Sequence, residues 1–298
     1  MSRLRAQEEI DWLASDRGPA PRIAVVFAHP DDETIGTGAR LPRLGAALFV
    51  CVTDGSPRDP ADARSAGFAT REAYATARQE ELSTVFRLAA IEPAVRHLGF
   101  IDQEASLHLM ELSRRLATVL REAEIDAVIT HPYEGGHPDH DATAFAVHAA
   151  CELLRRETER APLIIEMGSY HGNAGTMVPM RFPPYCRDAL YGLEFTLSDA
   201  ERRLKARLFD AYRTQRAVLK SFPLDVERFR LAPKYDFKQA PHPGRLFYEN
   251  FKWGIDGSRW RNLATVALDE LEIAPEVASL RSEQRASRRG ADAAGGAS

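Results

Sequence analysis

Short, continuously apolar runs alternate along this chain with longer segments that show helical periodicity. The apolar runs are rich in β-branched residues and cover residues 22–27, 46–53, 94–100, 127–130 and 163–165. Such runs are typical of strands that are buried on both faces, as in a parallel sheet. The segments between them predict a crossover helix that starts near Gly38 and further helices over residues 71–90, 105–123 and 142–156. We therefore expect an α/β fold in which helices flank a mostly parallel sheet.

The chain beyond residue 170 is less regular, and we expect it to form a C-terminal elaboration of the same domain. The predicted loops cover residues 59–67, 168–186 and 233–257, and an added strand is predicted over 191–197. A helix is predicted from the N-cap Ser198 to residue 221, and a short helix over the first 20 residues. We expect one domain over residues 1–275, with its core at 20–170 and its elaboration at 171–275. The tail at 276–298 is expected to be disordered because it is rich in Ala, Arg, Gly and Ser.

The composition narrows the classes of function. The net charge of −4 over 298 residues argues against a general nucleic-acid binder. No apolar run reaches the ~18 residues of a membrane-spanning helix, and the charged N-terminal segment lacks the apolar core of a signal peptide. Three widely separated cysteines, Cys51, Cys151 and Cys186, favour a reducing compartment over a disulfide framework. We expect a cytoplasmic enzyme that acts on a small molecule, and the sequence leaves the oligomeric state open, a homo-oligomer included.

Two motifs that carry His, Pro and Asp each follow a predicted buried strand. The first is A-H-P-D-D-E at residues 28–33, and the second is H-P-D-H-D at residues 137–141. In an open parallel sheet, ligands bind at the carboxyl ends of the strands, where both motifs are predicted to lie. One His and three acids within five positions are costly to crowd together unless a cation balances the negative charges of the acids. The motifs could each be a simple helix cap, with Asp139 or Asp141 capping a helix that begins near Ala142, but their joint occurrence favours a metal site.

Residues of the two motifs can together supply the ligands of a catalytic metal. A catalytic zinc has three His or carboxylate ligands and leaves one position to water. One set that fits is His29 and Asp32 from the first motif with His140 from the second. Asp31 is then free to act as a general base, and His137 to stabilise an oxyanion or to act as a general acid. Zinc and ferrous iron both suit these ligands.

The motifs resemble those of the PIG-L/LmbE family of zinc-dependent N-deacetylases. The resemblance covers residues 22–170 and includes T-D-G at 53–55, R-x-x-E-L at 78–82 and G-F-I-D at 99–102. It implies a Rossmann-like fold and hydrolysis of an N-acyl group, usually on a glucosamine-type sugar, so that the partner is a small amino-sugar conjugate. It also implies that His29, Asp32 and His140 bind the metal, that Asp31 is the base and that His137 stabilises the tetrahedral intermediate. Arg78 and Asp102 are implied to bind substrate.

Two other functions remain open at this point. One is a metal-dependent hydrolase that acts on a different N-acyl compound or on an ester through the same site. The other is a Rossmann-like binding module with a structural metal and no turnover. A dinucleotide site at G-T-G, residues 36–38, is disfavoured because Leu41 stands where the pattern requires a third glycine.

The remaining histidines and tryptophans divide by their place in the predicted elements. His131 and His171 follow predicted strands, and function and structure are equally good explanations for both. His97, His108 and His148 lie inside regular elements and are expected to be structural. A plain turn at His242 and packing against the sheet by Trp253 and Trp260 are the expected roles, although each could reach the site.

Overall fold

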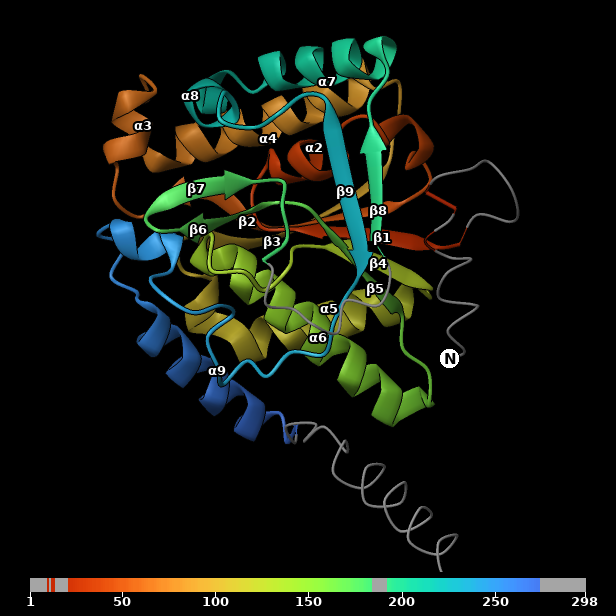
Figure 1. Ribbon diagram of the computed structural model, residues 1–298, viewed down its shortest axis with the longest axis vertical. Helices are drawn as coiled ribbons and strands as arrows, with labels where there is room; N and C mark the ends of the chain where they lie inside the picture. Colours follow the sequence, from red (N-terminus) through yellow and green to blue (C-terminus); the bar gives the residue numbers. More distant parts are fainter. Residues whose placement is uncertain (1–9, 11, 14–20, 184–191, 274–298) are drawn as a thin grey trace, which may run out of the picture.

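The computed structural model describes residues 10, 12, 13, 21–183 and 192–273, and its centre is a seven-stranded sheet (Figure 1). The strand order is β3 (Ala94–Asp102), β2 (Leu48–Pro57), β1 (Ile23–Phe27), β4 (Ala127–Thr130), β5 (Leu163–Met167), β9 (Val226–Leu231) and β8 (Gly192–Thr196). The first five strands in this order are parallel to one another. Strand β9 is antiparallel to both of its neighbours, β5 and β8. Val25 of β1 is paired with Phe49 of β2 and with Ile129 of β4. The predicted α/β fold with a mostly parallel sheet is therefore confirmed.

Helices cover both faces of the sheet (Figure 1). On one face lie α2 (Asp32–Thr37), α4 (Arg71–Leu88) and α7 (Asp199–Ala211), and on the other lie α5 (Leu109–Glu122), α6 (Pro138–Thr158) and α9 (Gly257–Glu270). Alternate residues of each strand point to the two layers, so Val26 packs with α5 and α6 while Phe27 packs with α4. Each central strand is thus buried on both faces, which explains its continuous apolar sequence.

The crossover after β1 differs from the prediction of a helix that starts near Gly38. The helix α2 begins at Asp32 and ends before Gly38, and a 3₁₀ turn, η1 (Leu41–Arg43), follows it. Two carboxylates, Asp32 and Glu33, occupy the first turn, where the helix dipole favours negative charge. The prediction that the crossover helix starts near Gly38 was therefore wrong, because the helix begins within the first motif.

All three predicted loops contain regular structure. Residues 59–67 include a short helix, α3 (Ala61–Ser65), and the segment after β5 forms a hairpin of β6 (Tyr170–Asn173) and β7 (Thr176–Pro179). The hairpin turn consists of Ala174 and Gly175, both with positive φ, as two-residue turns require. The Gly- and Pro-rich composition that suggested a loop therefore belongs to the hairpin. The loop at 233–257 includes a 3₁₀ turn, η4 (Phe247–Asn250).

The predicted helix over residues 198–221 is broken. Ser198 caps α7 as expected, through a capping box with Glu201, but the helix ends at Ala211. The 3₁₀ turn η3 (Arg213–Gln215) and the short helix α8 (Arg216–Leu219) follow. The backbone N–H and hydroxyl of Thr214 both donate to the Glu81 carboxylate on α4, which turns the chain towards α4. The strand β9 and the helix α9 were not predicted from the sequence.

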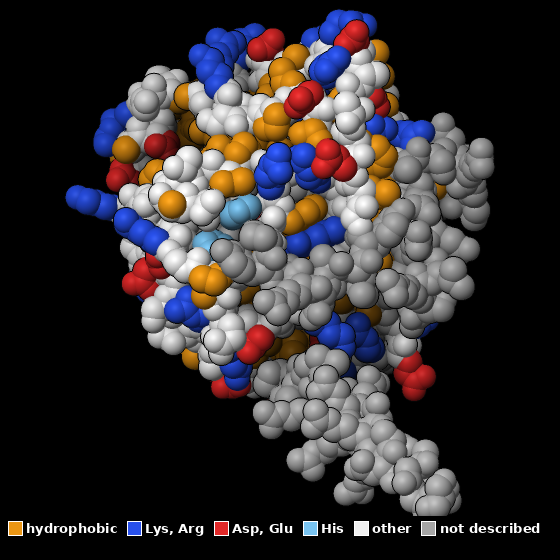
Figure 2. Space-filling model, viewed as in Figure 1, with side chains coloured by type: hydrophobic (Ala, Val, Ile, Leu, Met, Phe, Trp, Pro, Cys, Tyr) orange, Lys and Arg blue, Asp and Glu red, His pale blue; other side chains and the backbone are white. Residues whose placement is uncertain are grey.

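Some sequence predictions fall on residues that the structure does not describe. These are most of the N-terminal helix over residues 1–20, the tail at 276–298, and Cys186. Among the described residues, Cys51 and Cys151 are buried free thiols. None of the helices in the described ranges is long and apolar enough to cross a membrane. Figure 2 shows acidic and basic side chains interspersed on one face.

His148 on α6 is expected to make the stability of the fold depend on pH. It packs against Tyr235 and Phe237, its Nε2 is buried without a hydrogen-bond partner in the described chain, and burial, followed by the charge of Arg155, lowers the pKa of its ring to about 4. The unfolded chain, in which a His has a pKa of about 6.5, therefore binds more protons between pH 4 and 6.5. Stability is then lost as the pH falls through this window.

We expect this residue to lower the free energy of unfolding by on the order of 2 kcal/mol between pH 7 and pH 4. The figure is smaller than the full shift because part of the residue reaches solvent. Urea unfolding at several pH values would measure it, with His148→Leu as the comparison, since leucine cannot titrate. Parallel pH profiles for the two proteins would contradict the prediction.

Candidate metal and catalytic site

Both sequence motifs lie at the carboxyl ends of neighbouring strands, because β1 and β4 pair directly. The first motif follows β1, and its Asp31 has a φ of 141°, a conformation that L-residues rarely adopt. Strained backbone of this kind costs about 1–3 kcal/mol and is found mainly at functional sites. The second motif opens α6, with His137 as the N-cap and Pro138 at the first helical position.

A glycine is required where the second motif approaches β6. A Cβ at Gly136 would lie 2.0 Å from the carbonyl oxygen of Tyr170. This close approach brings the end of β5 and the hairpin against the motif, and it explains the Gly-rich turn that precedes His137.

The predicted ligands His29, Asp32 and His140 are brought together and are buried. Asp32 is central: its Oδ1 lies 3.1 Å from His140 Nε2, and its Oδ2 lies 3.2 Å from His29 Nδ1. The ring centroids of His29 and His140 are 5.2 Å apart. His140 and Asp32 come from different motifs, so the convergence expected from the sequence is present.

Three groups of side chains among the described residues have donor atoms close enough to hold one ion. They are His29 with His137 and His140, Asp32 with His131 and His140, and His29 with Asp102 and Asp139. The predicted ligand set spans the first two groups, which share His140. The ligand assignment itself stays a prediction.

His140 and His29 each have one ring nitrogen held by another protein group. Nδ1 of His140 lies 3.2 Å from Ser169 Oγ, and Nε2 of His29 lies 3.1 Å from Asp102 and 3.3 Å from Asp139. Metal-binding histidines typically have such a partner on the nitrogen that does not bind the ion. Burial lowers the pKa of His29, but the neighbouring carboxylates, Asp102 first, raise it well above its usual range. Asp102 is thus a partner of His29; that it also binds substrate stays a prediction.

His131 lies beside the predicted ligands and also contacts Ala28, which directly follows β1. Its Nε2 accepts a hydrogen bond of 3.1 Å from the backbone N–H of Ala28, so that lone pair is already used. The same nitrogen is 3.3 Å from Asp32 Oδ2, and the ring stacks on His140 at 4.0 Å. We conclude that His131 packs against Asp32 and His140 and ties β4 to β1.

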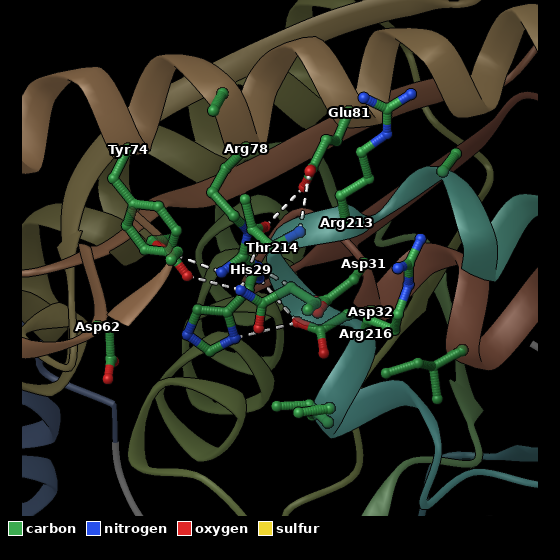
Figure 3. A pocket seen from close by; sticks show the side chains of 18 of the residues that line it. His29, Asp31, Asp32, Asp62, Tyr74, Arg78, Glu81, Arg213, Thr214 and Arg216 are labelled. Carbon is green, nitrogen blue, oxygen red and sulfur yellow. Dashed lines mark hydrogen bonds and ion pairs between the residues drawn. The ribbon is translucent and has the colours of Figure 1, made fainter. Parts of the chain in front are cut away.

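Asp31 is held by Arg78, which extends from α4 (Figure 3). The Arg78 guanidinium lies 3.5 Å from Asp31 Oδ1 and donates to the carbonyl oxygens of Pro30 and Gly55. Burial raises the pKa of Asp31 well above its usual range, although the charge of Arg78 opposes this. These contacts make Arg78 a positioning group for Asp31; that it also binds substrate stays a prediction.

His137 has a defined proton position. Its Nδ1 accepts from the backbone N–H of Asp139, so a neutral ring carries its proton on Nε2. Burial, followed by the nearby His29 and His140, lowers the pKa of His137 well below its usual range and favours the neutral ring. The ring lies against Trp253, at 4.7 Å between centroids. Trp253 therefore reaches the site, whereas Trp260 is fully buried in the core.

The two acids that could have capped the helix near Ala142 do not do so. The helix starts at Pro138, and His137 provides the cap. Asp139 accepts from the backbone N–H groups of Gln103 and Ala105, and Asp141 from those of Glu134 and Gly135. Sequence reasoning missed this use of Asp139, and it missed Ser169; the position of Ser169 just after a strand was the available signal.

A cavity of about 1320 Å³ opens beside the cluster. The cluster residues His29, Asp31 and Asp32 lie at one part of it, and Arg213 and Arg216 reach it from the segment after α7 (Figure 3). The segment after α7 also contacts the first motif directly, because the Tyr212 hydroxyl donates a hydrogen bond of 2.5 Å to the Glu33 carboxylate. The cavity is therefore shaped by residues on both sides of position 170.

Comparison with known proteins agrees with this geometry. The sequence model of the family described as PIG-L, GlcNAc-PI de-N-acetylase, matches residues 24–151, a stretch that contains both motifs. Over this stretch the chain is similar to the PIG-L family. The match ends within α6, so the C-terminal elaboration lies outside it.

Several proteins that are similar in sequence to this chain carry the names of deacetylases. A Bacillus cereus protein named probable N-acetyl-alpha-D-glucosaminyl L-malate deacetylase 2 is 29% identical over 144 residues, covering 45% of this chain and 63% of that protein. A Catenulispora acidiphila protein named 1D-myo-inositol 2-acetamido-2-deoxy-alpha-D-glucopyranoside deacetylase 2 is 31% identical over 162 residues, covering 46% and 53%. The chain thus spans between half and two thirds of the length of these relatives.

Solved structures of two deacetylases share the fold. The antimicrobial reagent A40926 pseudoaglycone deacetylase superposes with a TM-score of 0.52 at 19% identity, over 71% of this chain and 96% of that one. N,N'-diacetylchitobiose deacetylase from Pyrococcus horikoshii gives 0.50 at 20% identity, over 78% and 94%. Both matches extend beyond residues 24–151, so the fold is shared over more of the chain than the family model covers.

Proposed function

We propose that this protein is a metal-dependent hydrolase that removes an N-acetyl group from an amino-sugar conjugate. The observation that carries the proposal is that both motifs of the PIG-L match converge in one buried cluster beside a cavity. The relatives named above act on glucosaminyl conjugates, according to their names. The site residues named from the sequence all lie at or next to this cluster.

The residues present fit a divalent metal. Four imidazoles and three carboxylates face one another in a buried space. Without a cation the carboxylates repel one another and imidazole lone pairs are left unused. We assign His29, Asp32 and His140 as the ligands, with zinc as the first choice and ferrous iron also suited to the donor set. When bound, such an ion lowers the pKa of a water molecule and polarises an acyl oxygen.

Asp31 is the proposed general base. It is next to the ligand Asp32 in the chain, lines the cavity, and is held by Arg78. It takes a proton from the attacking water at a carboxylate oxygen, and the adjacent guanidinium keeps that oxygen oriented. General bases placed in this way contribute about 10²–10⁴-fold to a rate.

His137 is the proposed donor to the acyl oxygen. Its Nδ1 is used by the Asp139 N–H, which leaves a proton on Nε2 to donate a hydrogen bond as negative charge develops. The leaving amine then needs a proton. Asp31 after proton capture and His137 are the two groups of the site that can supply it.

The size of the cavity supports a conjugate over a free monosaccharide. Sites for small molecules usually measure about 300–1,000 Å³, and this cavity is larger. Its outer wall carries Tyr74 and the cations Arg213 and Arg216, which a single acetylated sugar at the cluster would not need. These residues are placed to contact the group attached to the sugar.

Acetate release from a panel of N-acetylglucosamine conjugates tests the proposal. Metal-stripped protein would be assayed with and without added zinc, and with ferrous iron under anaerobic conditions. We expect metal-dependent release, faster with conjugates than with N-acetylglucosamine itself. Turnover of other N-acyl compounds or esters alone would favour the alternative hydrolase, and bound metal without any turnover would favour a binding module.

A further inference from the structure

A second, smaller pocket lies between the β6–β7 hairpin and the loop that precedes η4. Its volume is about 390 Å³, and its walls come from residues 171–175 and 242–245. None of these residues lines the larger cavity. Two histidines face it from the two segments, His171 and His242, and each is only 5% exposed. Sequence analysis singled out both, and the proposed reaction uses neither.

The imidazole of His171 has a buried carboxylate behind it. Its Nδ1 lies 3.6 Å from Oε2 of Glu134, which is fully buried. Neither carboxylate oxygen of Glu134 has a hydrogen-bond partner among the described residues. A carboxylate in this position costs free energy unless a positive charge lies nearby. The Glu134 carboxylate favours the tautomer of His171 that carries its proton on Nδ1. In this tautomer Nε2 keeps its lone pair.

His242 is oriented in the same sense by a backbone carbonyl. Its Nδ1 lies 2.9 Å from the carbonyl oxygen of Pro243, which can only accept, so Nδ1 carries the proton. Its Nε2 is buried and has no hydrogen-bond partner in the described part of the chain. A buried, unused lone pair on a side chain this enclosed is uncommon and offers a position where an ion or an ordered water can bind.

The arrangement resembles that of metal-binding histidines, with His171 Nδ1 at 3.6 Å from Glu134 and without a hydrogen bond among the described residues. Such residues bind the ion through one ring nitrogen and donate the other N–H to a carboxylate or a backbone carbonyl. The ring centroids of His171 and His242 are 6.0 Å apart. Two imidazoles that share a zinc at nitrogen distances of about 2.0–2.1 Å have centroids roughly 5–6 Å apart, so small side-chain shifts suffice.

We propose that His171 and His242 form a second metal site, which binds a divalent transition metal such as zinc through Nε2 of each ring. Glu134 orients His171 and supplies the balancing negative charge. Arg245 at the rim opposes a cation, but its guanidinium donates to the carbonyl of Glu249. Two protein ligands leave coordination positions for water, so the site is weaker than the catalytic one. Bound metal would fasten the hairpin to the 242–245 loop.

Metal stoichiometry tests this proposal, with zinc and cobalt(II) as probes. The stripped wild-type chain is expected to bind two equivalents of zinc, and His242→Gln or His171→Gln only one. His97→Gln is the matched control, because His97 lies on β3 and lines neither pocket. Cobalt(II) absorption should lose one component in the two pocket variants and keep it in the control.

Glu134→Gln provides a variant that keeps both ligands. We expect the weaker equivalent to bind about 10–100-fold less tightly, since partners of metal-binding histidines have effects of this size. Wild-type protein that binds one equivalent, unchanged in His242→Gln, would overturn the second site. Failure of the proposed catalytic metal instead gives one equivalent in the wild type and none in His242→Gln, so the two failures are distinguishable.

Discussion

Asp31→Asn is expected to lower kcat for deacetylation by about 10²–10⁴-fold while the catalytic metal stays bound. The amide has nearly the same shape as the carboxylate but cannot accept a proton from water. The proposed ligands Asp32 and His29 are unchanged, so metal content should match the wild type. Measuring kcat and zinc per chain on the same preparation separates loss of the base from loss of the metal.

The surroundings of Asp31 indicate that Asp31→Asn keeps the fold. Asp31 has a φ of 141°, and asparagine tolerates positive φ better than most residues. Burial raises the pKa of the Asp31 carboxyl group most, and the negative charges of Asp32 and Glu33 raise it further. Replacing the carboxylate with a neutral amide therefore relieves repulsion. We expect the free energy of unfolding to be unchanged or slightly higher. The lost attraction to Arg78, at 3.5 Å, offsets part of the gain.

Asp62→Asn is the matched control. Asp62 lines the same cavity from α3, but it is exposed and belongs to neither motif. The same change of acid to amide should therefore alter kcat by less than about threefold, as surface substitutions usually do little. Full activity in Asp31→Asn would remove Asp31 from the role of base. Equal losses in both variants would indicate a general electrostatic effect of the cavity.

The sequence predicted the core of the fold because its central strands are uniformly apolar. It did not predict β9, and the reason is visible in the structure. Two of its inward positions carry Glu227 and Arg230, which are buried in ion pairs with Lys205 at 3.0 Å and Glu166 at 2.6 Å. These partners come from α7 and β5, so a local pattern cannot reveal that the charges are satisfied. Strand β9 therefore lacks the apolar run that marked the others.

The two motifs of the site could be predicted from the sequence, but the contacts that support them could not. The two motifs each follow an apolar strand, and only the pairing of β1 with β4 was needed to bring them together. The supporting contacts are non-local: Ser169 meets His140, and Asp139 meets the backbone of Gln103. The sequence also did not reveal that His137 is the N-cap of α6, because Asp and Ser are usual N-cap residues and histidine is not. Such contacts depend on the tertiary structure.

His140→Ala is expected to remove one equivalent of bound metal and to reduce deacetylation to background. Of the predicted ligands, His140 is the one present in both groups that span the proposed set. Its Nε2 is 3.1 Å from Asp32 Oδ1, and Ser169 holds its other nitrogen. Alanine is a strong helix former and His140 lies within α6, so the helix should persist.

His131→Gln is the comparison that makes this prediction specific. The ring of His131 is stacked on that of His140, at 4.0 Å, and is equally buried, but its Nε2 accepts the Ala28 N–H. The glutamine amide oxygen can accept the same bond. We therefore expect the metal equivalent to be retained, with metal affinity or activity reduced by about 10–100-fold as for groups that orient ligands.

The contrast between the two variants decides which histidine binds the metal. If His131 is a ligand, His131→Gln loses the metal equivalent as His140→Ala does, and the Ala28 hydrogen bond must break in the metal-bound protein. If it is a support, added zinc restores activity to His131→Gln and fails to do so for His140→Ala. Zinc titrations of activity on both proteins, beside circular dichroism to verify folding, provide the measurement. Rescue of His140→Ala at moderate zinc would contradict its assignment as a ligand.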